Sequence, residues 1–121
     1  MEGLADTLVK LAIHDDSYIE SVLAHGLRDT EASGLDARTQ AFVRVAALVA
    51  VDATPSAYMC AIEAAIAAGA SLDDVVGVLV ALLPSIGSDR VVSAAPKLGL
   101  ALGYDVDEAL EELDEAELPR T

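Results

Sequence analysis

Residues 54–84 read TPSAYMCAIEAAIAAGASLDDVVGVLVALLP, and this stretch decides the fold. Its first half predicts a helix, because Thr54 is a typical N-cap residue and Pro55 stands at the first helical position, where proline costs no hydrogen bond. Gly69 is typical of the left-handed residue that follows a helix C-terminus. The Ala-rich sequence between Pro55 and Gly69 therefore predicts a helix that can approach its neighbours closely.

A second helix is predicted directly after the first. Ser71 is its N-cap, and Asp74 three positions later is the acidic partner of a capping box. Between Val75 and Leu83 the chain is apolar on nearly every helical face, which is typical of a helix covered on several sides. Pro84 is expected to end this helix after Leu83, because proline cannot continue the backbone hydrogen-bond ladder.

The rest of the chain shows the same helical periodicity. Hydrophobic residues make up 54% of the 121 residues and aromatic residues only 3%, so the apolar content is mainly Ala, Val and Leu, which favours packed helices over a β-sandwich. Pro96 predicts a kink or a break near Ser93 in one of these helices. The sequence therefore predicts an all-α fold of six or seven helices in a single domain, residues 1–121. The further helices are expected at 3–13, 17–29, 36–51, 87–102 and from residue 105 onward.

The charge of the chain is strongly negative and uneven. Its net charge is −14, from 21 acidic and 7 basic residues, and such a surface disfavours binding to nucleic acid or to an anionic membrane surface. The tail, residues 104–121, has a thin apolar stripe of Val106, Leu110 and Leu113. We favour an amphipathic helix folded on the body or on a neighbouring subunit over a docking element for a basic partner. Eight acids lie in this tail: Asp105, Asp107, Glu108, Glu111, Glu112, Asp114, Glu115 and Glu117.

One cysteine, Cys60, is present, so no intramolecular disulfide can form and a reduced, cytoplasmic setting is the default expectation. The first ten residues, MEGLADTLVK, have no apolar segment of the kind found in signal peptides. The apolar runs are too short to span a bilayer.

Residues 35–103 carry a resemblance to a known family. LDART at 35–39 opens one helix, AAGA at 67–70 closes the next, and LDD at 72–74 opens a third that leads to a glycine turn at Gly87. The same order of landmarks occurs in the carboxymuconolactone decarboxylase and alkylhydroperoxidase D-like family, which this chain resembles. The resemblance implies the family's helical core for residues 35–103 and assembly into homo-oligomers, with residues 104–121 as an acidic helix beyond the core.

Redox members of that family carry Cys-x-x-Cys-x-x-x-His at the start of the helix that ends in the glycine, and a glutamate on the preceding helix. None of the corresponding side chains here ionises, so we expect neither cysteine-based peroxidase nor disulfide-reductase activity. The decarboxylating branch also relies on ionisable groups in this pocket, so the resemblance gives little support to that activity. Counted back from Gly69, the positions are Thr54, Ala57, Ala61 and, for the glutamate, Ala41 or Phe42.

Polar residues around the expected pocket form a candidate site. Arg44 could hold a substrate carboxylate while Asp52 or Tyr58 moves a proton, with Thr54 and Ser56 in the same region. A purely structural interpretation is favoured. In it Thr54 is an N-cap, Asp52 ends a helix and Arg44 forms an ion pair.

Three further features of the sequence bear on possible sites. Cys60 is a candidate for ligand binding, because a helix N-terminus lowers a thiol pKa, but its place inside an Ala-rich helix favours a buried, inert thiol. His25 has Ser21 and Asp29 at i−4 and i+4, an arrangement that rarely forms a catalytic relay. No His, Cys and carboxylate spacing indicates a metal site, so we expect neither a metal nor a cofactor.

Two functions of different classes stay open. The first, which we favour, is an oligomeric small-molecule-binding or structural protein without the redox site. The second is a non-redox enzyme of the decarboxylase or hydrolase type that acts on a small carboxylated or lactone substrate. The expected partner is a second copy, in a dimer, trimer or hexamer, because the helices at 42–51 and 75–83 are too apolar for one small chain to cover.

Overall fold

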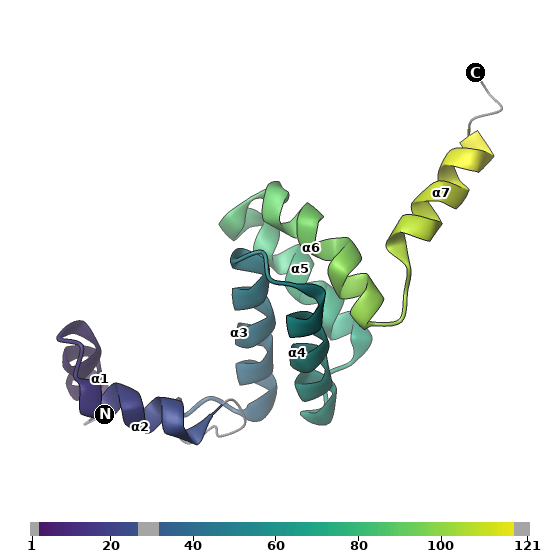
Figure 1. The fold of residues 1–121 in the computed structure, drawn as a ribbon. Helices are drawn as coiled ribbons and strands as arrows, with labels where there is room; N and C mark the ends of the chain where they lie inside the picture. The colour runs from purple at the N-terminus through teal and green to yellow at the C-terminus, as the bar shows by residue number, and fades with distance from the viewer. Residues whose placement is uncertain (1–2, 27–31, 118–121) are drawn as a thin grey trace. The chain divides into compact units, whose positions relative to one another are not determined.

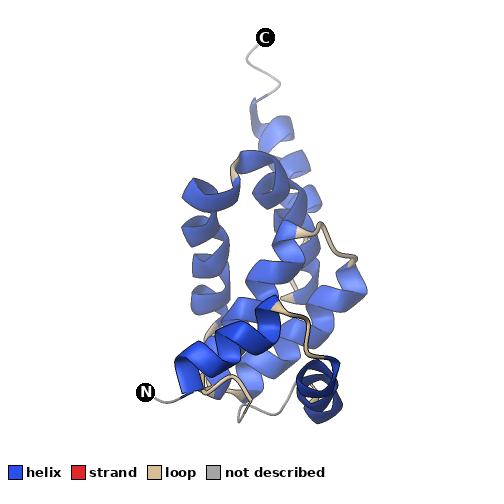
Figure 2. Ribbon diagram, turned by 90° about the vertical axis from the view of Figure 1, so that its left-hand side faces the viewer, coloured by secondary structure: helices blue, strands red, loops and turns tan. Residues whose placement is uncertain are grey.

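The computed structural model describes residues 3–26 and 32–117. All regular secondary structure in these ranges is helical (Figure 2), which confirms the predicted all-α fold of six or seven helices. None of the described helices is long and apolar enough to cross a membrane. The helices are α1 (Gly3–Ala12), α2 (Asp16–His25), α3 (Ala37–Ala50), α4 (Pro55–Ala67), α5 (Leu72–Ile86), α6 (Ser88–Ala101) and α7 (Val106–Glu117).

Contacts group the chain into two compact units, residues 1–35 and residues 36–121, whereas the sequence predicts one domain over residues 1–121. The first unit contains α1 and α2, and neither helix has a buried residue. The apolar residues of these two helices therefore contribute nothing to the buried core, which belongs to the second unit.

Local contacts define the two helices of the first unit. The Asp15 carboxylate accepts a hydrogen bond from the backbone N–H of Tyr18 at 3.1 Å, which caps α2. The ammonium of Lys10 on α1 lies 5.4 Å from the centre of the Tyr18 ring. α2 ends at His25, because Gly26 adopts a φ of 76°. The predicted continuation of this helix to residue 29 falls on residues outside the described part of the chain.

The second unit is built around a bundle of α3, α4, α5 and α6 (Figure 1). α3 packs against the other three helices, and α6 packs against both α4 and α5. The buried positions recur every three or four residues, so each helix turns one apolar face inward. They are Ala41, Val45, Val49, Tyr58, Ala61, Ile62, Ala65, Ala70, Val75, Leu79, Val91, Ala94 and Leu98.

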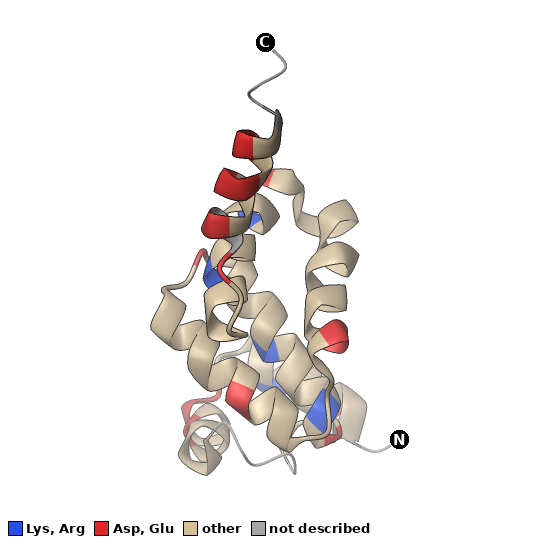
Figure 3. Ribbon diagram, turned by 90° about the vertical axis from the view of Figure 1, so that its right-hand side faces the viewer, with Lys and Arg blue, Asp and Glu red and all other residues tan. Residues whose placement is uncertain are grey.

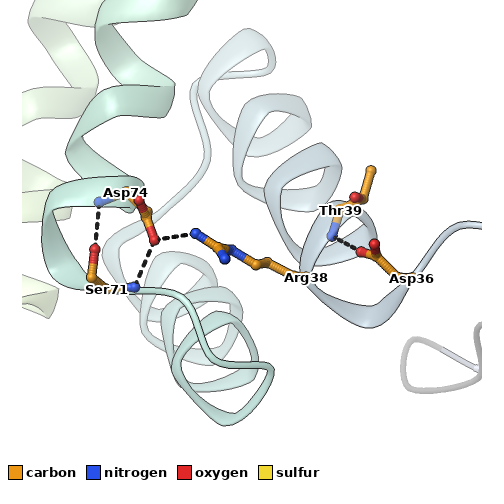
Figure 4. A network of polar contacts seen from close by, with 5 residues as sticks. All are labelled: Asp36, Arg38, Thr39, Ser71 and Asp74. Atoms are coloured by element: carbon orange, nitrogen blue, oxygen red, sulfur yellow. Dashed lines mark hydrogen bonds and ion pairs between the residues drawn. The ribbon is translucent and has the colours of Figure 1, made fainter.

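The predicted helix starts of α3 and α5 are confirmed. The Asp36 carboxylate accepts a hydrogen bond from the backbone N–H of Thr39 at 2.7 Å. Ser71 Oγ accepts one from the backbone N–H of Asp74 at 3.0 Å, and the Asp74 carboxylate accepts one from the backbone N–H of Ser71 at 2.9 Å (Figure 4). These bonds satisfy backbone donors that a helix N-terminus leaves unpaired.

The start of α4 differs from expectation in one respect. Thr54 and Pro55 occupy the predicted N-cap and first helical positions, but the Thr54 side chain makes no capping hydrogen bond. Its hydroxyl instead lies 3.2 Å from the hydroxyl of Ser56. The start of this helix therefore depends on the fixed φ of Pro55 rather than on a side-chain cap.

Neither Pro84 nor Pro96 ends the helix in which it lies. α5 continues past Pro84 to Ile86, so the predicted end after Leu83 is wrong, and Gly87 with a φ of 80° ends the helix instead. α6 runs without a break from Ser88 to Ala101 through Pro96. One proline removes a single backbone hydrogen bond. Buried side chains such as Leu98, beyond Pro96, hold the rest of the helix in place.

α7 carries the acidic residues of the tail. Asp105 caps it by accepting a hydrogen bond from the backbone N–H of Glu108 at 3.0 Å, and Figure 3 shows acidic residues along the length of the helix. α7 packs against α6. Leu110 and Leu113 nevertheless remain more than half exposed, at 53% and 55%. Within the second unit, these two leucines of the apolar stripe are therefore largely uncovered.

Candidate functional site

Asp52 follows α3 in an uncommon backbone conformation. Its φ is 55°, a left-handed value that side chains other than glycine rarely adopt. Its N–H donates to the carbonyl of Val49 at 3.2 Å, and the N–H of Ala53 donates to the carbonyl of Leu48 at 3.0 Å. This pattern is a Schellman helix end, in which glycine is the usual left-handed residue. Aspartate occupies this position here, and its carboxylate has partners on another helix.

That carboxylate joins the turn between α3 and α4 to α6. Asp52 Oδ1 accepts hydrogen bonds from Ser93 Oγ at 2.8 Å and from Lys97 Nζ at 3.0 Å. Arg90 Nη1 lies 3.5 Å from Asp52 Oδ2. Lys97 Nζ also donates to the carbonyl of Ala53 at 3.3 Å. We call these four side chains (Asp52, Arg90, Ser93 and Lys97) the Asp52 cluster.

The electrostatics of the cluster favour an ionised Asp52. The pKa of this carboxyl is lowered, first by the hydrogen bond from Lys97 and next by the one from Ser93. Arg90, Ser93 and Lys97 stand three and four residues apart, so they lie on one face of α6. A carboxylate that already accepts from these donors is a poor proton acceptor near neutral pH.

Arg44 does not join this cluster. It lies on α3, half-buried, and within the described residues it makes no hydrogen bond or ion pair. The predicted grouping of Arg44 with Asp52 is therefore not formed. Asp52 comes eight positions after Arg44, beyond the end of α3, a separation of about 12 Å if it is counted along a helix axis. The cations that Asp52 binds come from α6 instead.

Tyr58 is a core residue of α4. It is fully buried, and its hydroxyl has no hydrogen-bond partner among the described residues. The pKa of this hydroxyl is raised, mainly because burial disfavours the phenolate and also because the negative charge of Asp52 acts on it. Both effects oppose the proton transfer that the sequence assigns to Tyr58.

Cys60 lies on the exposed side of α4, so the predicted burial of this thiol is wrong. The reason is helical register. The buried positions of α4 are Tyr58, Ala61, Ile62 and Ala65, which place Cys60 on the opposite face.

The positions that correspond to the redox motif of the resembled family carry no ionisable side chain. Ala57 is half-buried and Ala61 fully buried in α4, while Thr54 stands exposed before the helix. Ala41 and Phe42, at the glutamate position, lie in or against the core. The pocket region of the resemblance is thus filled by small and aromatic carbon side chains, with only the unpaired hydroxyl of Tyr58 among them.

In the described part of the arrangement around His25, the Ser21 hydroxyl is not directed at the imidazole ring. His25 Nδ1 lies 2.6 Å from the backbone carbonyl of Ser21. The Ser21 hydroxyl donates to the carbonyl of Tyr18 at 2.7 Å, so it is directed away from His25. Asp29, the third member of the arrangement, lies outside the described residues. Among residues 3–26 and 32–117, no group of three or more His, Cys, Asp or Glu side chains could hold a metal ion.

A second polar cluster, which the sequence did not reveal, joins α3 to α5 (Figure 4). Arg38 Nη2 donates to Asp74 Oδ2 at 2.6 Å, and the Arg38 guanidinium lies 5.6 Å from the centre of the Phe42 ring. The pKa of the Asp74 carboxyl is lowered, first by the hydrogen bond from the Ser71 backbone. The capping box predicts Asp74, but only the packing of α3 against α5 places Arg38 beside it.

Comparison with known proteins adds no assignment. No family model matches the chain, and neither a curated protein nor a solved structure matches it.

Proposed function

We propose that this chain is a divergent, non-redox protein of the carboxymuconolactone decarboxylase-like kind, which acts in the cytoplasm as an oligomeric structural or small-molecule-binding protein. The observation that carries the proposal is the composition of the bundle core. Among the described residues, the buried side chains are all of the hydrophobic class, and no charged group is buried. A redox or acid–base centre needs ionisable groups held in such a place.

Its surface supports the oligomeric part of the proposal. Large apolar side chains are at least 40% exposed on every helix of the bundle, including Val43, Met59, Val80 and Val92. Exposed apolar side chains that align on one face of a helix mark interaction surfaces. Association between copies would remove part of this surface from water.

An enzymatic role receives less support. It needs Arg44, Asp52 and Tyr58 to act on one substrate, whereas Asp52 is bound to α6 and the Tyr58 hydroxyl is buried. Near Asp52, the hydroxyls of Thr54 and Ser56 contact one another, and Arg90 is paired with Asp52.

Two measurements test this function. Peroxide turnover and dithiol–disulfide exchange should not exceed the background rate, and Cys60→Ser should leave that rate unchanged. Peroxidase activity that Cys60→Ser abolishes would contradict the non-redox assignment. Analytical ultracentrifugation at low micromolar concentration should give a mass that is a multiple of the 12.5 kDa chain. A mass of one chain would refute the oligomeric assignment.

A further inference from the structure

The outward side of α5 carries an apolar ridge that the other helices of the second unit leave uncovered. Val75 and Leu79 of this helix are buried in the bundle. Four large side chains on the other side stay exposed, and their spacing of four, four and three residues aligns them in one stripe along the helix. They are Leu72 at 50%, Val76 at 45%, Val80 at 61% and Leu83 at 40% exposure.

Gly77 lies beside this ridge, and neither its backbone conformation nor a close contact with another described residue requires glycine there. It is exposed in the middle of α5, its φ is not positive, and a Cβ atom built on it would meet nothing within 4 Å. Glycine inside a helix lowers stability relative to alanine, so such a residue normally serves a turn or a close approach of another backbone. Gly99 of α6, in contrast, is buried within the bundle.

Gly77 and Ala81, one turn apart and both exposed, form a furrow of small residues next to the ridge. Helices pack by placing the ridge of one into the furrow of the other, and this arrangement needs small residues where the backbones come closest. We propose that α5 is a self-association surface, on which the ridge of each copy lies in the furrow of a second copy about a two-fold axis. The proposal rests on the homo-oligomer put forward above and names the surface that forms it.

The low charge of this surface disfavours a strongly charged partner and makes it the place where two copies of this acidic chain repel one another least. Asp73 is the one charged residue on the exposed side of α5, since Asp74 is paired with Arg38. A strongly charged partner would find almost no counter-charge here and would lose solvation against the ridge. Two copies of a chain with a charge of −14 repel one another, and this repulsion is weakest where both surfaces are nearly uncharged.

The same charge argument sets the orientation. An antiparallel contact of the two α5 helices places the two Asp73 residues at opposite ends, about 15 Å apart along the axis, which is ten residue steps at 1.5 Å each. A parallel contact would place them side by side. The antiparallel arrangement also aligns Val76 of each copy with Val80 of the other, which satisfies the requirement of a two-fold axis.

Ultracentrifugation of the full-length chain with Gly77→Leu tests the surface. Leucine fills the furrow but favours the helix, so we expect at least a tenfold rise in the dissociation constant of this contact with unchanged helical circular dichroism. Val80→Asp should have the same effect. Ala67→Leu, the same kind of change at an exposed position of α4, is the matched control and should keep the wild-type mass.

The outcomes separate the two proposals. If Gly77→Leu and Val80→Asp keep the wild-type mass, or if Ala67→Leu lowers it equally, α5 is not the interface and the oligomer assignment survives. A monomeric wild type overturns both.

Disulfide cross-linking tests the antiparallel orientation. The single variants Val76→Cys and Val80→Cys, each in a Cys60→Ser background, are oxidised separately and as a mixture. The mixture should give the most disulfide-linked dimer, and more cross-linking in each variant alone would overturn the antiparallel arrangement.

Discussion

Two helix ends in the bundle share one backbone pattern but not one residue type. After α4, Gly69 has a φ of 95°, its N–H donates to the Ile66 carbonyl at 3.0 Å, and the next N–H donates to the Ala65 carbonyl at 3.0 Å. After α3, Asp52 forms the equivalent pair of bonds with a φ of 55°. Gly69 supplies only backbone freedom, whereas Asp52 accepts some strain and binds α6 with its carboxylate. At these two ends, therefore, Gly69 provides the turn alone, and Asp52 provides the turn and also binds a neighbouring helix.

The largest expected effect is at the glycine end. Gly69→Val places a β-branched residue at a φ of 95°, although a Cβ atom there would meet nothing within 4 Å. The cost therefore comes from the backbone, and we expect a loss of about 2 kcal/mol or more in the free energy of unfolding, measured by urea denaturation. Pro55→Gly, at the other end of α4, should cost less. The opposite order of urea midpoints would contradict the assigned role of Gly69.

The aspartate end should respond differently to two small replacements. Asp52→Ala loses the cluster and keeps the strain, whereas Asp52→Gly loses the cluster and relieves the strain. Both should be less stable than the wild type. The free energy of unfolding of Asp52→Gly should be about 1 kcal/mol higher than that of Asp52→Ala, because this is the typical cost of placing alanine in a left-handed backbone conformation. If Asp52→Gly equals or exceeds the wild type in thermal stability, the contacts with α6 do not compensate for the strain.

Acidification should remove the contribution of the Asp52 carboxylate to the stability of the fold. Its folded pKa lies below the ordinary value, so its contribution is present above the unfolded pKa of about 4 and is lost as the pH falls through the folded pKa. Asp36 and Asp74 also have lowered pKa values, so the wild-type profile alone does not isolate Asp52. The difference in melting temperature between the wild type and Asp52→Asn should be constant from pH 7 to pH 5 and should shrink below pH 4. A difference that stays constant down to pH 2 would show that the charge of Asp52 contributes nothing.

The smallest change in stability is expected for a substitution at Tyr58, the buried residue of α4 on which the charge of Asp52 acts. Tyr58→Phe removes a buried hydroxyl that has no partner among the described residues, so stability should stay the same or rise by up to about 1 kcal/mol. The melting temperature at pH 7 measures this change. A clear loss of stability would reveal a hydrogen bond to that hydroxyl.

These comparisons separate what sequence reasoning could reach at the candidate site from what it could not. The pattern predicts Asp52 as a helix-end residue, and Asp52 does follow α3. It does not predict the burial of Tyr58 in the core. The partners of Asp52 were missed, because Ser93 and Lys97 are 41 and 45 residues away in the chain. The burial of Cys60 was mispredicted because an Ala-rich helix with few polar residues does not show which face turns inward.

The sequence by itself determined the helical content, the starts of α3 and α5 and the end of α4 at Gly69. These features depend on residues at most a few positions apart, so a cap at Asp36 or Ser71 needs no distant partner. Only the tertiary structure decided that Pro84 and Pro96 stay inside helices, that Asp52 binds α6 and that Gly77 faces outward. Each of these depends on how the helices are rotated against one another, which is set by the packing of all their apolar faces together.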